Sequence, residues 1–534
     1  MAERLARIRS HLTRSSDELH VIPCVSSFEK MEEVLSPSAR VFLVGLFKEF
    51  FEDVRTLHVC RHERQLQLDK CKSIQDAFAT CHFRNGPYGD GDAWTIDPLP
   101  DILRDRRVDI GDTSPAREVE LVTALNSGAQ GVQVDMDDGH CPSWRNVIEG
   151  HWNLMQAVRG NLKGLKSSPA LLLVRPRAWN MDEENVMING HVMPGALFDF
   201  GLESASEAAL WAKIFSYSER VLGIPKRTIK ATVLIEHILA AFEMDAILYE
   251  LRHYSSGLNC GMWDYVASFL SKFRSFQEAT VPDRQVFVSM RSPFLSNYMK
   301  LLIHTCKKRG APATTGMVPF VLDTRNADLL TKIQSAKAYE ANAGANGALV
   351  FDPSLVPVVQ AIFDQAQPSN KPFVMPTRED LLILPRGNVT MHSITFNLRV
   401  VLAYIESWVN QNGIVILDGC VEDSATAEIS RSQLWHWIKF SEPIHDTEEV
   451  VSMSVIHQVL TTLRTKYSPK AQALTLCVLQ AERFPTFLTT FLYNQSLVWI
   501  KAFHATGGCV FDNLVVRGEL LGSGAGLISF KSIK

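Results

Sequence analysis

Two acidic residues, Glu236 and Asp264, each end a short apolar segment of the kind that forms a buried β-strand. The run Ala231-Thr-Val-Leu-Ile-Glu236 ends in the first carboxylate, and the segment Leu258–Asp264 ends in the second. Neighbouring strands of an α/β barrel bring the residues at their C-terminal ends together on one face. Mg²⁺ commonly takes one or two protein carboxylates and leaves its other positions to water and substrate oxygens. We therefore expect Glu236 and Asp264 to be Mg²⁺ ligands, with a helix cap or a surface ion pair as the alternative role for either.

Arg175 and Asp423 have the side chains needed to act on a reacting group beside such a cation. Arg175 ends the apolar run Ala170–Arg175, so its guanidinium would lie at the mouth of a barrel and could stabilise a developing oxyanion. A structural ion pair is the alternative. Asp423 lies directly before a helical pattern, where it could be a helix N-cap or a general base supplied by the C-terminal region.

A further set of acids follows a third candidate strand. Asp135, Asp137 and Asp138 lie in the segment Val134-Asp-Met-Asp-Asp138. The end of this strand would lie on the same face of a barrel as the other strand ends. We therefore expect that one of these acids could supply an additional metal contact.

Alternating apolar strands and amphipathic helices occupy the middle of the chain, a texture typical of βα units. It predicts an α/β fold: a TIM (β/α)8-type barrel over residues 101–370, after an N-terminal helical segment (1–100) and before a C-terminal helical domain (371–534). The expected strands are Arg107–Ile110, Gly131–Met136, Ala170–Arg175, Thr228–Glu236, Leu258–Asp264, Ala313–Met317 and Gly347–Phe351. The expected C-terminal helices are Phe396–Asn410, Thr426–Phe440, Glu448–Lys466 and Ala471–Lys501.

Composition narrows the class of protein. The 534 residues are 46% hydrophobic and 21% charged, which is ordinary for a globular protein. A net charge of −4 without a long basic run argues against nucleic-acid binding. No apolar stretch approaches the length of a transmembrane helix, so we expect no membrane partner. The ten cysteines include no CxxC pair, which favours reduced, unpaired thiols in an intracellular compartment.

The N-terminus carries a candidate targeting signal. Arg4-Leu5, five further residues and His11-Leu12 resemble the type 2 peroxisomal targeting signal. This resemblance implies a peroxisomal or glyoxysomal protein and a peroxisomal import receptor as a partner. A surface helix and an Arg-rich mitochondrial presequence are the alternatives.

Several blocks of sequence between about residues 95 and 520 are long, ordered and rich in Trp, Gly and acids. They are Leu125–Ala129, Arg175–Arg177, Gly195–Gly201, Ala231–Arg252, Leu258–Asp264, Ser292–Leu295 and Glu422–Leu434. These blocks resemble the malate synthase family in its shorter, A-type form. The resemblance implies a Mg²⁺-dependent Claisen condensation of acetyl-CoA with glyoxylate, followed by hydrolysis of the thioester to malate and CoA, as in the glyoxylate cycle.

The resemblance also implies roles for individual residues. Arg175 matches the catalytic arginine of the family and Asp423 matches its aspartate base. Glu236 and Asp264 match the Mg²⁺ carboxylates, and Asp137 stands where the family usually has a glutamate of the metal surroundings.

The parts of the site that would bind substrates come from two further segments. Backbone amides near Met262 and Trp263 are expected to orient the glyoxylate carboxylate. The segment Leu349-Val-Phe-Asp-Pro353 replaces one like Trp-Val-Ala-His-Pro, which the resemblance places along the acyl-CoA channel. Leu349 and Pro353 are therefore candidate substrate-binding residues.

The chain departs from the family pattern directly after Leu202. In the family, a further helix and a strand precede the block that begins here at Glu203. About 30 residues, the scale of one βα unit, are absent. A barrel without one strand has two unpaired edges or closes in another way. Three functions stay open: a malate synthase, a related acyl-CoA/2-oxo acid condensing enzyme or malyl-CoA thioesterase, and a catalytically inactive binding protein.

Overall fold

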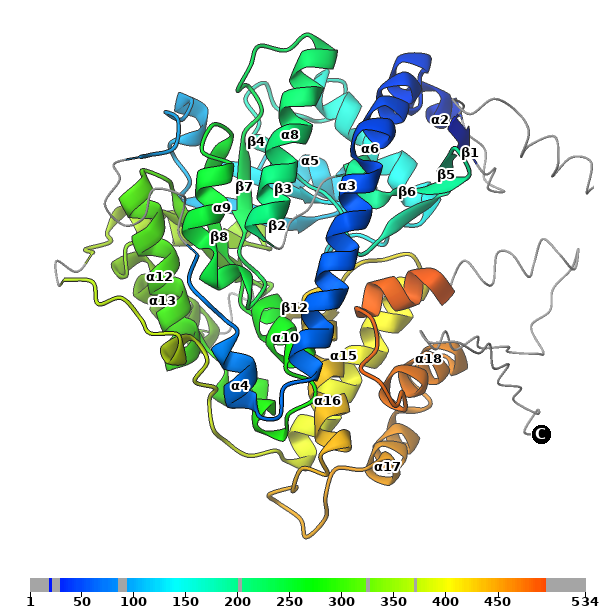
Figure 1. Cartoon of the computed structure of the whole chain (residues 1–534), viewed down its shortest axis with the longest axis vertical. Helices are drawn as coiled ribbons and strands as arrows, with labels where there is room; N and C mark the ends of the chain where they lie inside the picture. The colour runs from blue at the N-terminus through cyan, green and yellow to red at the C-terminus, as the bar shows by residue number, and fades with distance from the viewer. Residues whose placement is uncertain are drawn as a thin grey trace, which may run out of the picture. The chain divides into compact units, whose positions relative to one another are not determined.

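Seven parallel strands form the central sheet of the computed structural model (Figure 1). The structure describes residues 19–21, 29–84, 94–199, 204–322, 327–368 and 372–495. All seven predicted strands are present, with ends that differ by up to a few residues. They are β2 (Val108–Thr113), β3 (Gly131–Asp135), β4 (Leu171–Arg175), β7 (Ala231–Leu234), β8 (Ser255–Cys260), β9 (Ala313–Val318) and β10 (Gly347–Val350).

The sheet is open at one place, between β4 and β7. The strand order is β4-β3-β2-β10-β9-β8-β7, so the pairing of β10 with β2 joins the first and last strands, as in a barrel. Within the described residues, β4 and β7 have no partner strand on their outer edges. We call this opening the seam. It lies where the sequence lacks one βα unit, and it confirms the prediction of a missing strand.

The seam determines which strands of the sheet are buried and which are partly exposed. Every residue of β2, β8 and β10 is buried, because each of these strands has a neighbour on both sides. On β4, by contrast, Val174 is 50% exposed, and no residue of that strand is buried. An edge strand with an exposed β-branched residue is the expected result of removing its neighbour.

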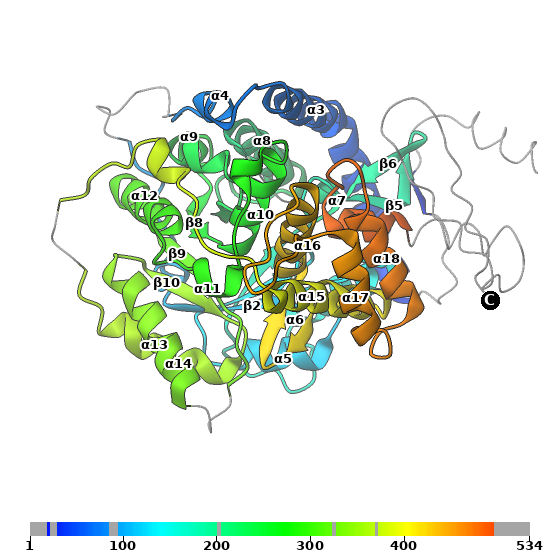
Figure 2. The same ribbon diagram turned by 90° about the horizontal axis from the view of Figure 1, so that it is seen from below.

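Helices cover the outside of the sheet (Figure 2). The longer ones end where the sequence supplies a stop signal: α8 ends before Gly223 and α12 before Gly310, and both glycines have a positive φ. The helices after the strands are α5 (Glu118–Leu125), α6 (Trp144–Val158), α8 (Ala205–Leu222), α9 (Met244–Glu250), α10 (Trp263–Lys272), α12 (Pro293–Arg309), α13 (Ala327–Asn342) and α14 (Val356–Asp364).

A small antiparallel sheet, which sequence analysis did not predict, follows β4. It consists of β1 (Leu19–Val21), β5 (Asp182–Ile188) and β6 (His191–Pro194), in the order β1-β5-β6. Asn189 and Gly190 form the turn between β5 and β6, and both have a positive φ. Asn-Gly is the preferred pair for a two-residue hairpin turn, so this dipeptide was the available signal.

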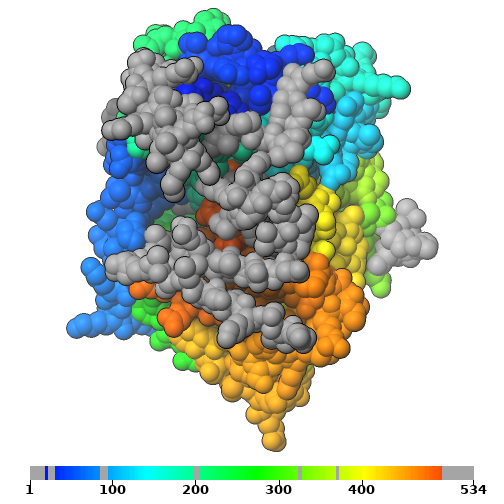
Figure 3. Space-filling model, turned by 90° about the vertical axis from the view of Figure 1, so that its right-hand side faces the viewer, coloured from blue at the N-terminus to red at the C-terminus, as the bar shows by residue number. Residues whose placement is uncertain are grey.

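Helices also precede and follow the barrel region. The N-terminal ones are α2 (Glu29–Val34), α3 (Pro37–Asp69) and α4 (Ile74–Ala79), and the C-terminal ones are α15 (Met391–Val409), α16 (Ser424–Lys439), α17 (Met453–Leu463) and α18 (Pro469–Leu479). Figure 3 shows both groups on one face, the former in blue and the latter in yellow to orange. Across the described residues, no helix combines the length and apolar character needed to cross a bilayer.

Three of the predicted helix boundaries are wrong by five residues or more, and the first is that of α15, which begins at Met391 rather than Phe396. The helix predicted from Glu448 begins at Met453, because Ser452 caps it by accepting a hydrogen bond from the Val455 N–H. The helix predicted over Ala471–Lys501 ends at Leu479, and residues 481–487 are not helical. Residues up to Phe484 form one compact unit, and residues from Pro485 belong to a second.

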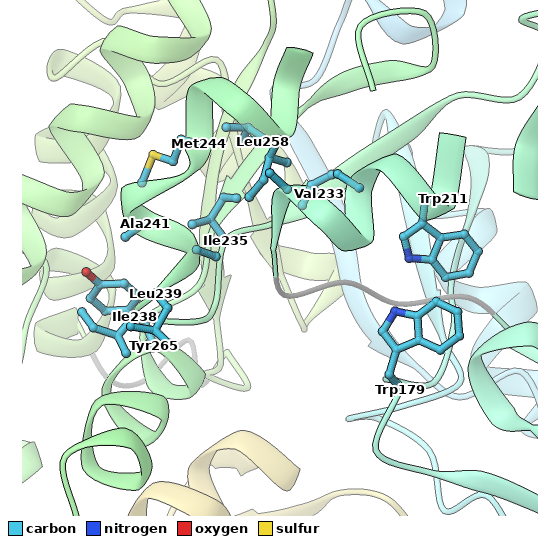
Figure 4. Close-up of a cluster of buried hydrophobic side chains, with 14 of the residues drawn as sticks. Trp179, Trp211, Val233, Ile235, Ile238, Leu239, Ala241, Met244, Leu258 and Tyr265 are labelled. Carbon is cyan, nitrogen blue, oxygen red and sulfur yellow. The ribbon is translucent and has the colours of Figure 1, made fainter. Parts of the chain in front are cut away.

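The strand ends of the barrel region rest on a large apolar cluster. Figure 4 shows Val233, Ile235 and Leu258 in this cluster, with the rings of Trp179 and Trp211 beside them. The two tryptophan ring centroids lie 5.1 Å apart. The burial of this cluster fixes the backbone at the end of β7, which leads to Glu236, and at the end of β8. Asp264, predicted as a strand end, lies just beyond β8 in the first turn of α10.

Candidate active site

One pocket, at the C-terminal ends of the strands, brings together most of the predicted site residues. The space between its walls, open mouth included, is about 810 Å³. Its charged lining consists of Asp112, Asp138, Arg175, Glu236, Asp264, Lys337, Glu340 and Asp423. Of the predicted site residues, the lining contains Arg175, Glu236, Met262, Trp263, Asp264, Leu349 and Asp423. Asp137 and Pro353 are not part of it.

The guanidinium of Arg175 is held by acids from two strands. Its Nη1 donates to Asp135 Oδ2 at 3.2 Å and to Asp138 Oδ2, and its Nη2 donates to Glu236 Oε2 at 3.2 Å. The ion pair that sequence analysis gave as the alternative therefore exists, and the same side chain lines the pocket. An arginine fixed in this way presents a preorganised positive charge to a reacting group.

Asp138, Glu236 and Asp264 form the group of acids that could hold a metal ion in the part of the chain described. One oxygen from each lies within 4.8 Å of the others. Ligand oxygens about 2.1 Å from an octahedral Mg²⁺ are roughly 3 to 4 Å apart, so small side-chain rotations would complete the site. Three carboxylates are the hard oxygen ligands that Mg²⁺ prefers. The donor set fits the cation implied by the resemblance.

The raised pKa values of Glu236 and Asp264 reflect how poorly the buried pocket solvates negative charge. Burial raises the pKa of the Glu236 carboxyl to about 7, although Arg175 opposes the shift. Burial, with repulsion from Asp138 and Glu236, also raises the pKa of Asp264 well above its ordinary value. A divalent cation would relieve both effects by compensating the ionised carboxylates.

Asp137 lies beside this group rather than in it. Its Oδ2 is 3.9 Å from Arg175 Nη2, and its neighbour Asp138 is the residue that points toward Glu236 and Asp264. Successive residues at a strand end face different directions, which is why the choice among Asp135, Asp137 and Asp138 could not be made from sequence.

Gly261 allows the carboxylate of Glu236 to lie against the end of β8. A Cβ atom at position 261 would overlap Glu236 Oε1. The close approach of side chain to backbone is therefore a specific demand for glycine at this position.

Asp423 combines both roles considered for it. It is the N-cap of α16: its Oδ1 accepts from the Thr426 N–H at 2.8 Å. It also lines the pocket, and burial, followed by repulsion from Asp138, raises its pKa to about 6. A cap fixed by its own helix is a well-oriented carboxylate near the pH range in which a general base works.

A hairpin places Asp423 over the barrel. Strands β11 (Val415–Leu417) and β12 (Cys420–Glu422) pair with each other, and Cys420 bridges to Phe320 after β9. The Val421 N–H also donates to Pro319 O at 2.7 Å. Behind it, α16 packs against α10 and α15 (Figure 2).

Asp112 was missed by sequence analysis. It is the next-to-last residue of β2, in a pocket wall that also contains Asp423. Its φ of 51° is uncommon for a residue with a side chain. Burial and the charge of Asp423 raise its pKa well above the ordinary value, so its neutral form donates toward Asp423. The predicted strand ended at Ile110, before this residue.

Lys337 and Glu340 lie on α13, and the sequence pattern of this outer helix does not single them out as site residues. Lys337 Nζ donates to Gly316 O at 2.7 Å and to Glu340 Oε2 at 2.8 Å. Thr315 Oγ1 donates to the same carboxylate oxygen at 2.6 Å. Lys337 is a second cation in the pocket wall, on the side of β9, and Glu340 compensates its charge.

Met262 and Trp263 lie at the N-terminus of α10, in the pocket. The first N–H groups of a helix have no acceptor within it and favour an anion. The ring of Trp263 also contacts the Arg284 guanidinium, 4.9 Å from its centroid, and Arg284 pairs with Glu422 at 3.1 Å. The geometry suits a small carboxylate bound near the cation.

Comparison with known proteins identifies the family. The family model "Malate synthase, TIM barrel domain" matches residues 202–384, and "Malate synthase, C-terminal" matches residues 388–496. A malate synthase of Dictyostelium discoideum is 38% identical in an alignment 416 residues long, which covers 68% of this chain and 76% of that relative. The chain belongs to the malate synthase family.

Two further members of the malate synthase family are similar to this chain over most of its length. The malate synthase of Myxococcus xanthus is 38% identical and covers 78% of this chain and 83% of its own length. Malate synthase A of Escherichia coli is 35% identical and covers 79% of this chain and 86% of its own length. The matched TIM barrel begins at Leu202, directly after the segment where this malate synthase family member lacks a strand.

Proposed function

We propose that this chain is a malate synthase, which condenses acetyl-CoA with glyoxylate and hydrolyses the product thioester to malate and CoA. The observation that supports it is a single pocket containing Arg175, the carboxylates of Asp138, Glu236 and Asp264, and Asp423. These residues come from four strand ends and from the C-terminal helical region. Family membership and this convergence point to the same reaction.

Asp423 acts as the general base. Its carboxylate takes a proton from the methyl group of acetyl-CoA, and the electron pair of that C–H bond moves into an enolate. Asp423 is suited to this step because the hydrogen bond that it accepts from the Thr426 N–H fixes the direction of its carboxylate and burial raises its pKa. Asp112, in its neutral form, donates toward Asp423 and helps to keep it ionised.

Arg175 stabilises the enolate oxygen. The enolate carbon attacks the aldehyde carbon of glyoxylate, and the C=O π pair moves onto the aldehyde oxygen, which takes up a proton to become the hydroxyl group of malate. Water then adds to the thioester carbonyl, and the C–S bond breaks to release CoA as the thiol and leave a carboxylate. The three acids around Arg175 hold its guanidinium in place, so little reorganisation is needed as negative charge develops on the oxygen.

Asp138, Glu236 and Asp264 would hold Mg²⁺. The cation, when bound, polarises the aldehyde of glyoxylate as a Lewis acid. Asp137 is proposed to support the site by helping to hold the Arg175 guanidinium, since its Oδ2 lies 3.9 Å from Arg175 Nη2. The N–H groups at Met262 and Trp263 orient the glyoxylate carboxylate.

An aliphatic side chain, Leu349, lines the part of the pocket that we propose takes the acyl group. Leu349 lies in the pocket lining, whereas Pro353 is part of the short helix that starts after Asp352. We propose that Leu349 contacts the acyl chain and Pro353 shapes the channel behind it. Because an aliphatic wall tolerates a larger acyl group, condensation of a different acyl-CoA is the second candidate function.

A CoA-release assay tests the proposal. The purified chain, Mg²⁺, acetyl-CoA and a thiol reagent should give free thiol only when glyoxylate is added, together with malate. A panel with propionyl-CoA and other 2-oxo acids separates the second candidate. A folded chain that binds neither Mg²⁺ nor acetyl-CoA and releases no thiol would favour a non-catalytic protein.

We also propose that the protein is imported into peroxisomes through the Arg4–Leu12 signal. Those residues lie outside the described part of the structure. Malate synthases of Candida tropicalis, Gossypium hirsutum and Glycine max are named glyoxysomal, which supports the location. A fluorescent fusion should become diffuse in the cytosol when Arg4 and Leu5 are both changed to Ala; a mitochondrial pattern of the unmodified fusion would contradict the proposal.

A further inference from the structure

Tyr298, on α12, contacts the backbone of both segments that carry the candidate metal ligands. Its hydroxyl donates to Ile235 O, the carbonyl just before Glu236, and lies 3.3 Å from Gly261 O, three residues before Asp264. The side chain is fully buried. A single O–H group therefore joins the two strand ends on the side away from the pocket.

The strand ends need such a connection because their ladder stops short of the ligands. The last paired residues of β7 and β8 are Leu234 and Asn259. Beyond them, the Ile235 N–H still donates to Asn259 O at 2.9 Å, but the next residue is Glu236. On its other side β7 faces the seam, where no described strand pairs with it. The support that a closed barrel would give to Glu236 is missing there.

The contact at Gly261 extends the effect to the side chain of Glu236. The carboxylate of Glu236 lies directly against Gly261, where a Cβ would overlap it. Tyr298 thus contacts the backbone that bears Glu236 and also the backbone on which the Glu236 carboxylate rests.

We propose that Tyr298 is a positioning residue for the divalent cation: its hydroxyl ties the ends of β7 and β8 together and holds Glu236 and Asp264 at the spacing that the cation needs. The inference concerns the Mg²⁺ site of the proposed function and rests on that function. Divalent-cation sites lose affinity when the partners that orient their ligands are removed, by about 10- to 100-fold in well-studied cases.

The chain supplies a matched control for the hydroxyl. Tyr265 stacks on Tyr298, with ring centroids 4.0 Å apart and planes at 11°, and it is equally buried. Its hydroxyl has no hydrogen-bond partner among the described residues. Tyr265→Phe therefore removes the same atom from the same stack without loosening the strand ends.

The test is direct Mn²⁺ binding, with Mn²⁺ as a spectroscopic substitute for Mg²⁺, to the full chain and to Tyr298→Phe and Tyr265→Phe. We expect Tyr298→Phe to weaken binding at least fivefold and Tyr265→Phe to change it less than twofold. Circular dichroism and melting temperature confirm that both variants are folded. The increase of melting temperature on adding Mg²⁺ gives a second readout, which should be smaller in Tyr298→Phe alone.

Equal binding by Tyr298→Phe and the unmodified chain would overturn the inference, and so would an equal loss in Tyr265→Phe, because the ring stack rather than the hydroxyl would then matter. CoA release separates this result from the proposed function. An unmodified chain that binds Mn²⁺ but releases no CoA contradicts the function and leaves the inference standing. Normal turnover of both variants at limiting Mg²⁺ contradicts the inference alone.

Discussion

Arg175 Nη2 donates to Glu236 Oε2 at 3.2 Å and thereby joins the ends of β4 and β7, two strands that do not pair with each other. The contact crosses the seam on the pocket side. A residue proposed for catalysis also connects the two edges that the missing strand would have joined. Charge and hydrogen bonding thus hold the site together where the sheet does not.

Changing Arg175 should lower turnover sharply, and it should also lower stability because the buried acids around it lose their partner. Arg175→Gln removes the positive charge that the enolate oxygen needs, and losing one such stabilising donor typically costs about 10²- to 10³-fold in kcat. Arg175→Lys, the control, keeps the charge but not the planar fork that reaches Asp138 and Glu236 together, so it should recover only part of the rate. Steady-state CoA release measures both variants, and a kcat within threefold of the unmodified chain for Arg175→Gln would exclude the assigned role.

The pH profile should reflect Asp423. Its pKa is raised to about 6, and the base must be ionised to accept a proton, so kcat should rise with pH through about 6 and then level off. Asp423→Asn cannot accept the proton and should lose about 10²- to 10⁴-fold in kcat at every pH. Stopped assays from pH 5 to pH 8 provide the profile. A rate that does not change over this range would contradict the assignment.

The sequence predicted the strands better than the directions of side chains at their ends. All seven strands were visible as short apolar runs bounded by turn residues, and the absent strand was visible as an interruption after Leu202. The choice of Asp137 over Asp138 illustrates the limit. Two adjacent acids have the same composition and nearly the same position, and only the twist of the chain after β3 decides which one meets Glu236 and Asp264.

Residues that join a site through tertiary contacts were harder still to find. Lys337 lies on a helix whose pattern predicts only an outer layer, and it reaches the pocket because β9 lies beneath it. Asp112 itself adopts the positive φ and the adjacent Gly111 does not, so the glycine gives no signal of it. Asp423 was recognised, but its two roles are compatible only because β11 and β12 turn the start of α16 toward the barrel.

The position of the metal contact can be tested by comparing Asp138→Asn with Asp137→Asn. Asp138 belongs to the group that could hold a metal, while Asp137 lies outside it. We expect Asp138→Asn to weaken Mn²⁺ binding by about 10-fold or more and Asp137→Asn to act like the removal of an orienting neighbour, with the smaller loss. Titration of Mn²⁺ by electron paramagnetic resonance measures both. A larger loss in Asp137→Asn would assign the contact to that residue instead.

The seam can be tested by two equivalent substitutions on neighbouring strands. Val134 and Val174 are register partners on β3 and β4, but Val134 is fully buried and Val174 is 50% exposed. Val134→Thr buries a hydroxyl and should cost about 1 to 3 kcal/mol of unfolding free energy. Val174→Thr should stay within about 0.5 kcal/mol, because its side chain already meets solvent. Urea denaturation measures the difference, and equal costs would show that another segment covers β4 in solution.

Glyoxylate-dependent release of CoA by this chain, measured alongside its Asp423→Asn variant, tests the central claim most directly. The account predicts free thiol and malate in equal amounts when acetyl-CoA, glyoxylate and Mg²⁺ are all present, loss of the signal on chelation of the metal, and a rate at least about 10²-fold lower in the variant. A folded chain with intact Mn²⁺ binding that releases no CoA above the Asp423→Asn level would contradict it.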